Sequence, residues 1–105
     1  MITLHIEHPI TDYTVWKSAF DRFAGAREDA GVLGHEVRRP VDDPAYVVVD
    51  LWFATAGQAE GFLEFLRTRV WADPARAPAL VGRPLARLLV TEEVAQMPAQ
   101  EAERV

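Results

Sequence analysis

The chain has 105 residues, a formal net charge of -5 and no cysteine. This length supports one domain. The lack of cysteine excludes disulfides, thiol catalysis, iron–sulfur clusters and cysteine zinc sites. The acidic balance and the scattered basic residues argue against nucleic acid or an anionic membrane surface as a partner.

No apolar run approaches the roughly 18 residues of a membrane span. The first residues lack a signal-peptide pattern, so we expect a cytoplasmic protein.

The amino-terminal third predicts a strand followed by a helix. Residues 2–7 alternate between apolar and polar side chains, which is typical of a strand with one core face, and Pro9 ends it. Thr11-Asp12 can cap the helix that follows. Between Tyr13 and Ala30 one side of the chain is apolar, which predicts an amphipathic helix with Gly31 as its C-cap. The apolar residues of that side are Trp16, Ala19, Phe20, Phe23 and Ala30.

The middle of the chain predicts a hairpin. Residues 34–39 are short, charged and weakly alternating, and they indicate a second strand. The run Pro40-Val41-Asp42-Asp43-Pro44 has dense turn chemistry. Residues 46–53 are rich in valine and aromatic side chains and form the clearest strand of the sequence.

The remaining segments predict a second helix, a connection and a last strand. Thr55-x-x-Gln58 fits a capping box. It opens a helix whose apolar face consists of Ala59, Phe62, Leu63, Leu66 and Val70. Residues 73–84 contain three prolines and indicate a connecting loop. Residues 85–94 complete the sheet as a last strand, and residues 95–105 are expected to be a flexible C-terminal tail.

The order β-α-β-β-α-β predicts one α+β domain over residues 1–94. Right-handed crossovers give a ferredoxin-like fold, in which a four-stranded antiparallel sheet of order 4-1-3-2 carries both helices on one face. Parity places Val47, Val49, Leu51 and Phe53 under the helices. The other face would carry Tyr46, Val48, Asp50, Trp52, Thr3, His5, Glu7, Arg87, Leu89 and Thr91. Its large apolar side chains favour a homodimer that forms through the sheet face, with an open-faced monomer as the alternative.

Two segments resemble a known superfamily. They are His8-Pro9-Ile10-x-Asp12-Tyr13-x-x-Trp16, and Asp42-Asp43-Pro44 before a valine-rich strand that ends in Trp52-Phe53. Over about residues 1–94 the chain resembles the dimeric α+β barrel superfamily, and within it the small bacterial branch related to antibiotic-biosynthesis monooxygenase domains. The resemblance implies the fold and the dimer. It leaves the activity open, because the superfamily includes cofactor-independent monooxygenases, haem-degrading enzymes, cyclases and isomerases.

One departure from that superfamily concerns the pocket. Its cofactor-free monooxygenases and haem degraders use a pocket asparagine, and this sequence contains no asparagine. The cyclases use histidine with tyrosine or aspartate, and those residue types are present. We therefore expect no haem or other cofactor.

His8 is the candidate catalytic residue. Its parity matches that of Ile2, Leu4 and Ile6, so it should point under the helices, where a histidine can exchange a proton at neutral pH. The alternative is a histidine that hydrogen-bonds the turn before the helix. The expected substrate-binding residues are Tyr13, Trp16, Phe20, Trp52 and Phe62, with Phe23 and Trp71 as further aromatic side chains that could wall a pocket or only fill the core.

The other polar candidates have weaker patterns. His5, Glu7, Asp50 and Arg87 share the dimer face, where they could line a polar cavity or form interface ion pairs. His35 should lie too far from His8 to share a metal, so no metal site is expected. Arg67, Arg69, Arg76 and Arg83 could bind an acidic group or lie on the solvated surface.

Two functional hypotheses remain. The first is a homodimeric pocket protein that acts on a flat aromatic or polyketide-like small molecule as a cofactor-independent monooxygenase, cyclase or isomerase. The second is a non-catalytic ligand-binding or assembly module. A cavity beside His8 would favour the first hypothesis, and a closed core would favour the second.

Overall fold

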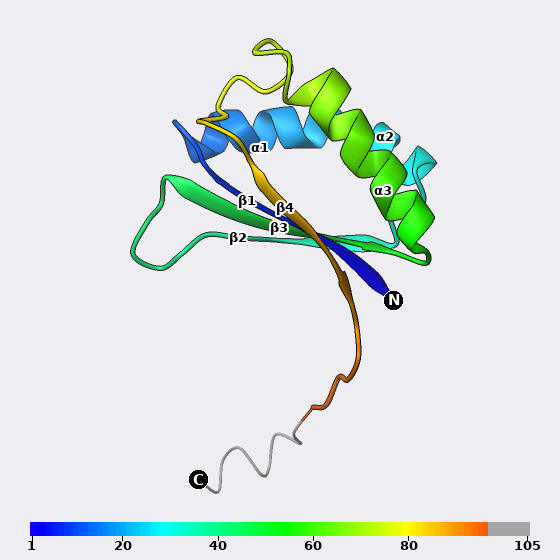
Figure 1. The fold of residues 1–105 in the computed structure, drawn as a ribbon. Coiled ribbons are helices and arrows are strands. Elements are labelled where there is room, and N and C mark those ends of the chain that lie inside the picture. The colour runs from blue at the N-terminus through cyan, green and yellow to red at the C-terminus, as the bar shows by residue number, and fades with distance from the viewer. Residues whose placement is uncertain (97–105) are drawn as a thin grey trace, which may run out of the picture.

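The computed structural model describes residues 1–96 and shows a four-stranded sheet in the order β2-β3-β1-β4. All three strand pairs are antiparallel. Read from its other edge, this order is the expected 4-1-3-2, so the ferredoxin-like fold is confirmed. The helices all lie on one side of the sheet, and its other side carries none of them (Figure 1). Within residues 1–96 no helix has the length and apolar character needed to cross a membrane.

The central strands are β1 (Ile2–Pro9) and β3 (Tyr46–Phe53), and they pair along their whole length. Their side chains alternate between the two faces because successive residues of a strand point in opposite directions. The residues on the helical face, Leu4, Ile6, Val47, Val49, Leu51 and Phe53, are at most 4 % exposed. The face assignment made from parity is therefore confirmed, and these side chains form the centre of the core.

The helix expected between residues 13 and 30 is broken into α1 (Tyr13–Arg22) and α2 (Ala24–Asp29). Asp12 caps α1 by accepting a hydrogen bond from the Val15 amide at 2.9 Å. At Phe23 the backbone leaves helical geometry, with φ -96° and ψ 15°. The single-helix prediction was wrong at this point, because hydrophobic periodicity continues across a one-residue break.

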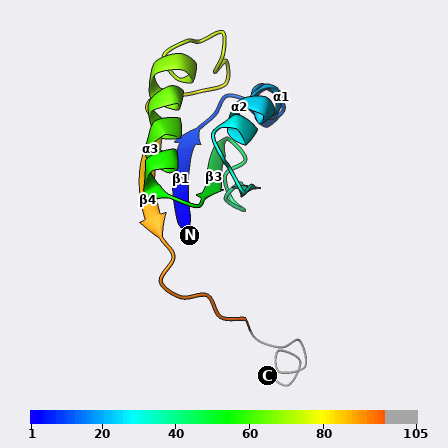
Figure 2. The ribbon, with the colours of Figure 1, turned by 90° about the vertical axis from the view of Figure 1, so that its right-hand side faces the viewer.

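The second helical segment also has two parts, α3 (Ala56–Phe65) and the π-helical turn η1 (Leu66–Val70). Thr55 caps α3 as expected, accepting from the Gln58 amide at 3.2 Å. In η1 the Trp71 amide donates to the Leu66 carbonyl at 2.7 Å, which is an i to i+5 bond. Such turns are rare and are found often at functional sites. Figure 2 shows α3 beside α1 and α2 above the sheet.

The edge strands are β2 (Gly34–Arg38) and β4 (Leu85–Val90). The last strand is shorter than the expected 85–94, because its partner β1 begins at Ile2 and the final pair is Ile2 with Val90. Residues 91–96 lie beyond that pair. The flexible tail expected over residues 95–105 falls, from residue 97 onward, outside the described residues.

Candidate functional site

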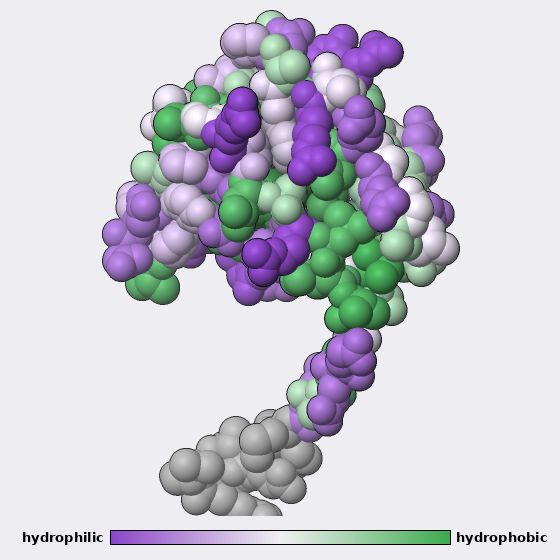
Figure 3. Space-filling view, viewed as in Figure 1, coloured by the Kyte–Doolittle hydropathy of each residue, from purple (hydrophilic) through white to green (hydrophobic). Residues whose placement is uncertain are grey.

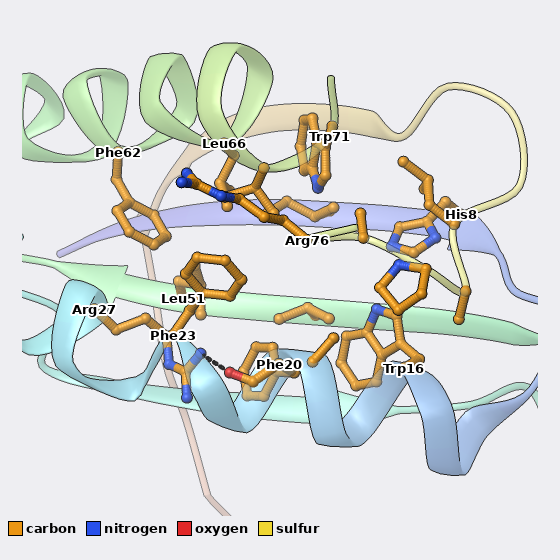
Figure 4. Close-up of a pocket in the computed structure, with 18 residues that line it drawn as sticks. His8, Trp16, Phe20, Phe23, Arg27, Leu51, Phe62, Leu66, Trp71 and Arg76 are labelled. Atoms are coloured by element: carbon orange, nitrogen blue, oxygen red, sulfur yellow. Dashed lines mark hydrogen bonds between the residues drawn. The ribbon is translucent and has the colours of Figure 1, made fainter. Parts of the chain in front are cut away.

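A cavity of about 80 Å³ lies between the helices and the sheet. Its floor is the helical face of β1 and β3. One wall is α1 with Phe23 and with Arg27 of α2, and the other wall is α3 with η1 (Figure 4). Eighteen residues line it: Ile6, His8, Trp16, Ala19, Phe20, Phe23, Arg27, Val49, Leu51, Phe62, Leu66, Val70, Trp71, Arg76, Ala77, Pro78, Ala79 and Leu80. The two hypotheses predicted either a closed core or a cavity beside His8, and the cavity is present.

The two helical walls face each other because each segment repeats its apolar residues at helical spacing. Ala19 and Phe20 lie one turn after Trp16 on α1, and residues three or four positions apart share a helix face. Phe62 and Leu66 are related in the same way across the junction of α3 and η1. The aromatic side chains expected as wall candidates, Trp16, Phe20, Phe23, Phe62 and Trp71, all line the cavity.

His8 lies at one end of the cavity (Figure 4) and is 4 % exposed. Its Nδ1 is 2.9 Å from the Pro9 carbonyl oxygen. Because a carbonyl oxygen can only accept, Nδ1 carries the proton and Nε2 of the neutral ring is the acceptor. Burial lowers the pKa of His8, and the hydrogen bond to Pro9 opposes that effect only in part. The imidazole is thus neutral at pH 7, with Nε2 as a base.

The Nε2 atom of His8 is accessible. Among residues 1–96 it has no hydrogen-bond partner. Every fully enclosed side-chain nitrogen or oxygen in those residues does have a partner, so Nε2 is not fully enclosed. Its lone pair is therefore open to a hydrogen-bond donor, and His8 is one of the residues that line the cavity. The bond to Pro9 also fits the structural alternative, in which His8 fixes the turn before α1, and the two roles are compatible.

The connection after η1 closes the cavity end at His8. The Thr11 amide donates to the Ala79 carbonyl at 2.9 Å, and the Val81 amide donates to the Pro9 carbonyl at 3.2 Å. A bridge between Ile10 and Leu80 continues this pairing. These bonds hold residues 77–80, which the sequence indicated only as a loop, against the end of β1.

An aromatic row connects His8 to the far side of α1. The ring centroids of His8 and Trp16 are 6.4 Å apart, those of Trp16 and Phe20 are 5.0 Å apart, and those of Phe20 and His35 are 5.2 Å apart. Such spacings are favourable for aromatic pairs. The exposed His35 therefore packs on Phe20 at the outer end of the row.

Two of the expected substrate-binding residues do not line the cavity. Tyr13 stacks on Trp16 at 5.9 Å and supports that ring from outside. Trp52 lies on the opposite face of the sheet, where its ring covers Gly34. The other three expected residues, Trp16, Phe20 and Phe62, do line it.

Arg27 also lines the cavity, although it was not among the predicted site residues. It is 7 % exposed, its Nη1 donates to the Phe20 carbonyl at 2.6 Å, and its guanidinium lies 3.8 Å from the centroid of the Phe20 ring. At the break between α1 and α2 the same carbonyl also accepts from the Phe23 amide at 3.2 Å. A signal was present in the sequence, since Arg27 follows Phe20 by seven residues and Phe23 by four and so shares their helix face.

The opposite face of the sheet carries a hydrogen-bonded polar network. His5 contacts Asp50 at 2.7 Å and Glu7 at 2.8 Å. Arg38 also donates to Asp50, and the Tyr46 hydroxyl donates to Glu7 at 2.7 Å. The contacts with Glu7 and then Asp50 raise the pKa of His5 despite its partial burial. This network lies away from the cavity.

The remaining polar candidates are dispersed. Of Arg67, Arg69, Arg76 and Arg83, Arg76 alone lines the cavity. Arg76 donates to the Arg69 carbonyl at 3.1 Å. Over residues 1–96 no group of three or more potential metal ligands occurs.

Comparisons with known proteins identify the fold. No family model matches the chain, and no curated protein matches it in sequence. Among solved structures, a Deinococcus radiodurans protein provisionally described as an antibiotic biosynthesis monooxygenase is similar, with a TM-score of 0.71 and 12 % identity over 94 % of this chain and 100 % of that chain. SnoaB, a cofactor-independent oxygenase from Streptomyces nogalater, has a TM-score of 0.64 and 15 % identity over 89 % and 94 % of the two chains.

A third similar structure is the monooxygenase from the gene ActVA-Orf6 of Streptomyces coelicolor in complex with nanaomycin D. It has a TM-score of 0.61 and 17 % identity over 93 % of this chain and 92 % of that chain. Two further similar structures, both from an uncultured marine organism, are dimeric ferredoxin-like proteins. These similarities confirm the ferredoxin-like fold.

Proposed function

We propose that the protein is a homodimeric enzyme that binds a flat, hydrophobic small molecule in the cavity and moves a proton with His8. The observation that carries this proposal is a buried, neutral histidine with an accessible Nε2 at one end of an apolar cavity. Binding sites for small molecules are typically concave and apolar with a few polar groups of this kind.

The proposed step is proton transfer from a ligand O–H or an acidic C–H to Nε2 of His8. The step produces an imidazolium and a ligand anion, and the same imidazolium returns the proton to another atom of the ligand. Because burial lowers the pKa of His8, the imidazolium is a stronger acid than a solvent-exposed one. The Nδ1 bond to Pro9 keeps the ring in one orientation throughout. This step is common to isomerases, cyclases and the first stage of oxygenation without a cofactor.

The cavity volume limits the ligand. A cavity of about 80 Å³ is smaller than the roughly 150 Å³ cavity that accepts benzene in an engineered protein. A single ring therefore fits after small side-chain shifts, and a ligand with several rings must displace part of the wall. A small-molecule ligand is also supported by the monooxygenase neighbour that was crystallised with nanaomycin D.

The test follows proton transfer directly. Cyclohex-3-enone is a one-ring carbon acid whose isomerisation to the conjugated enone is followed by ultraviolet absorbance, and 1,8-dihydroxyanthrone adds a probe that oxygen converts to a quinone. We expect His8→Gln to lower the rate with either probe by about 10² to 10⁴. His35→Gln is the matched control, because His35 is exposed and does not line the cavity.

The outcomes separate catalysis from binding. Equal rates for the two variants and the wild type would remove His8 as the base. If the wild-type protein binds cyclohex-3-enone, seen as amide shifts of cavity residues, but converts neither probe, the cavity belongs to a non-catalytic binding module.

The homodimer is proposed from the uncovered sheet face. Leu85 and Leu89 of β4 pair with Glu7 and Thr3 on that face, and they are 54 % and 43 % exposed. Apolar surface also gathers where the chain leaves the body (Figure 3). Two of the similar solved structures are dimeric. A second copy would cover this face and the network around His5, since monomers seldom leave such surface open.

Light scattering after size exclusion tests the assembly. We expect the wild type to have twice the chain mass and Trp52→Lys to have the chain mass, because Trp52 lies on the uncovered face. Val41→Lys is the control, since Val41 is fully exposed in the turn after β2. A monomeric wild type, or a Trp52→Lys variant that stays dimeric, would contradict dimerisation through this face.

A further inference from the structure

Arg27 is a buried cation that lines the cavity, and no carboxylate of the described chain neutralises it. It is 7 % exposed, yet none of the ion pairs found among residues 1–96 includes it. The charge of Asp21 acts on it only from a distance. Arginine is seldom buried to this extent without an ionic partner, because removing its charge from water is costly.

The contacts that Arg27 does make satisfy a small part of its capacity. The Phe20 carbonyl accepts one of its five N–H groups, and the ring of Phe20 stacks against the guanidinium. Among the described residues, every side-chain nitrogen that is fully enclosed has a hydrogen-bond partner. The nitrogens of Arg27 that have no partner are therefore not fully enclosed. They are available to an acceptor that is not part of the chain.

Arg27 and His8 lie at opposite ends of the cavity (Figure 4). The lining between them is apolar except for Arg76, which has Asp73 as an ion-pair partner at 3.7 Å. A molecule that spans the cavity would meet a proton acceptor at one end, mostly apolar side chains along its length and, at the other end, the charge of Arg27, which is unpaired within residues 1–96. Charge-assisted bonds from a guanidinium suit a planar carboxylate in particular.

We infer that the ligand of this cavity is an acid, a flat hydrophobic molecule whose carboxylate is bound by Arg27. This inference rests on the proposed function of the cavity and names the chemical class of its ligand. The carboxylate supplies the negative charge that the described chain does not place beside Arg27. It also orients the ligand, so that the opposite end of the molecule faces Nε2 of His8.

A purely structural role makes a different prediction. If Arg27 serves only to hold the Phe20 carbonyl at the break between α1 and α2, its charge has no influence on which ligand binds. Arg27→Gln keeps an N–H donor near that carbonyl and removes the charge, whereas Arg27→Lys keeps the charge. Arg67→Gln is the matched control, because Arg67 is an exposed arginine of η1 that does not line the cavity.

The probes are 4-fluorobenzoate and 4-fluorobenzamide, which have nearly the same shape and differ in charge. Their binding to the full chain is measured by ¹⁹F NMR. We expect the wild type and Arg67→Gln to bind the benzoate about ten to a hundred times more tightly than the benzamide, the range that a hydrogen bond between charged groups provides. Arg27→Gln should lose most of this preference, because Arg76, the other arginine of the cavity, has Asp73 as a partner, and Arg27→Lys should keep part of it.

A second measurement needs no variant. In ¹⁵N-labelled wild type, the Nε–H signal of Arg27 should shift on addition of 4-fluorobenzoate and stay in place on addition of 4-fluorobenzamide. Equal affinity of the wild type for the two probes, or an Arg27 signal that neither probe moves, would overturn the inference and leave the proposed cavity function standing. Failure of both probes to bind would instead contradict the cavity function itself.

Discussion

Filling the cavity from α1 distinguishes a binding pocket from a packing defect. Ala19 is 7 % exposed and lines the cavity wall between Trp16 and Phe20. Ala19→Leu places three additional carbon atoms in a space of about 80 Å³, where one water molecule needs roughly 10–15 Å³. At about 0.8 kcal/mol for each buried CH₂ group, the upper limit of the gain in unfolding free energy is about 2.4 kcal/mol.

The expected result is a more stable protein that no longer binds its ligand. For a chain of this length, 2 kcal/mol raises the melting temperature by about 8 °C. The assay is thermal unfolding by circular dichroism at one fixed protein concentration, combined with ¹⁹F NMR titration of 4-fluorobenzamide. Ala24→Leu is the control, because it adds the same atoms at an exposed position of α2 and should change neither quantity by much.

Two results would refute this reasoning. A lower melting temperature for Ala19→Leu would mean that the walls cannot accept the side chain, so the space is not available as described. Unchanged affinity for 4-fluorobenzamide would mean that the probe binds elsewhere, even if the variant is stabilised.

The remaining predictions concern the opposite face of the sheet. Contacts with Glu7 and Asp50 raise the pKa of His5, so the stability that its charge contributes is complete below about pH 6.5 and is lost as the pH rises through the folded-state pKa. The melting-temperature difference between wild type and His5→Gln should therefore shrink from pH 6 to pH 9, and a difference that grows would contradict the assignment. Gly34→Ala should lower the unfolding free energy by about 1–3 kcal/mol in a urea titration, because the new Cβ would lie 2.7 Å from the Trp52 ring. An unchanged transition midpoint would show that the ring moves freely.

The position of His8 was predictable because it depends on local geometry. Strand alternation assigns each residue of β1 to a face, and the apolar residues before His8 identify which face is buried. Strand alternation likewise predicted that Val49 and Leu51 lie under the helices, and in the structure both line the cavity. Strand alternation also placed Trp52 on the outer face. The separate prediction that Trp52 binds substrate therefore does not fit the cavity of a single chain.

Arg27 shows where sequence reasoning stopped. Its helix face was predictable, but charged residues are normally assigned to solvent, and the sequence does not show that the Arg27 side chain donates to the Phe20 carbonyl beside a break in the helix. The break at Phe23 and the π turn at Leu66 likewise leave no mark on the hydrophobic pattern. A helix can shift its hydrogen-bonding register by one residue while the apolar residues keep nearly the same spacing, so the hydrophobic pattern does not reveal the shift.

The sequence by itself determined the order of the elements, the faces of β1 and β3 and the presence of His8 under the helices, because these follow from periodicities of two and 3.6 residues within continuous segments. Only the tertiary structure decided that a cavity remains, that residues 77–80 close it beside Pro9 and that Arg27 lines it without an ion pair in the described chain. The physical reason is that a cavity is the volume left over when α1 and η1, which are far apart in the chain, pack on one sheet. That volume depends on side-chain shapes and backbone irregularities in several segments at once, which no single periodic pattern records.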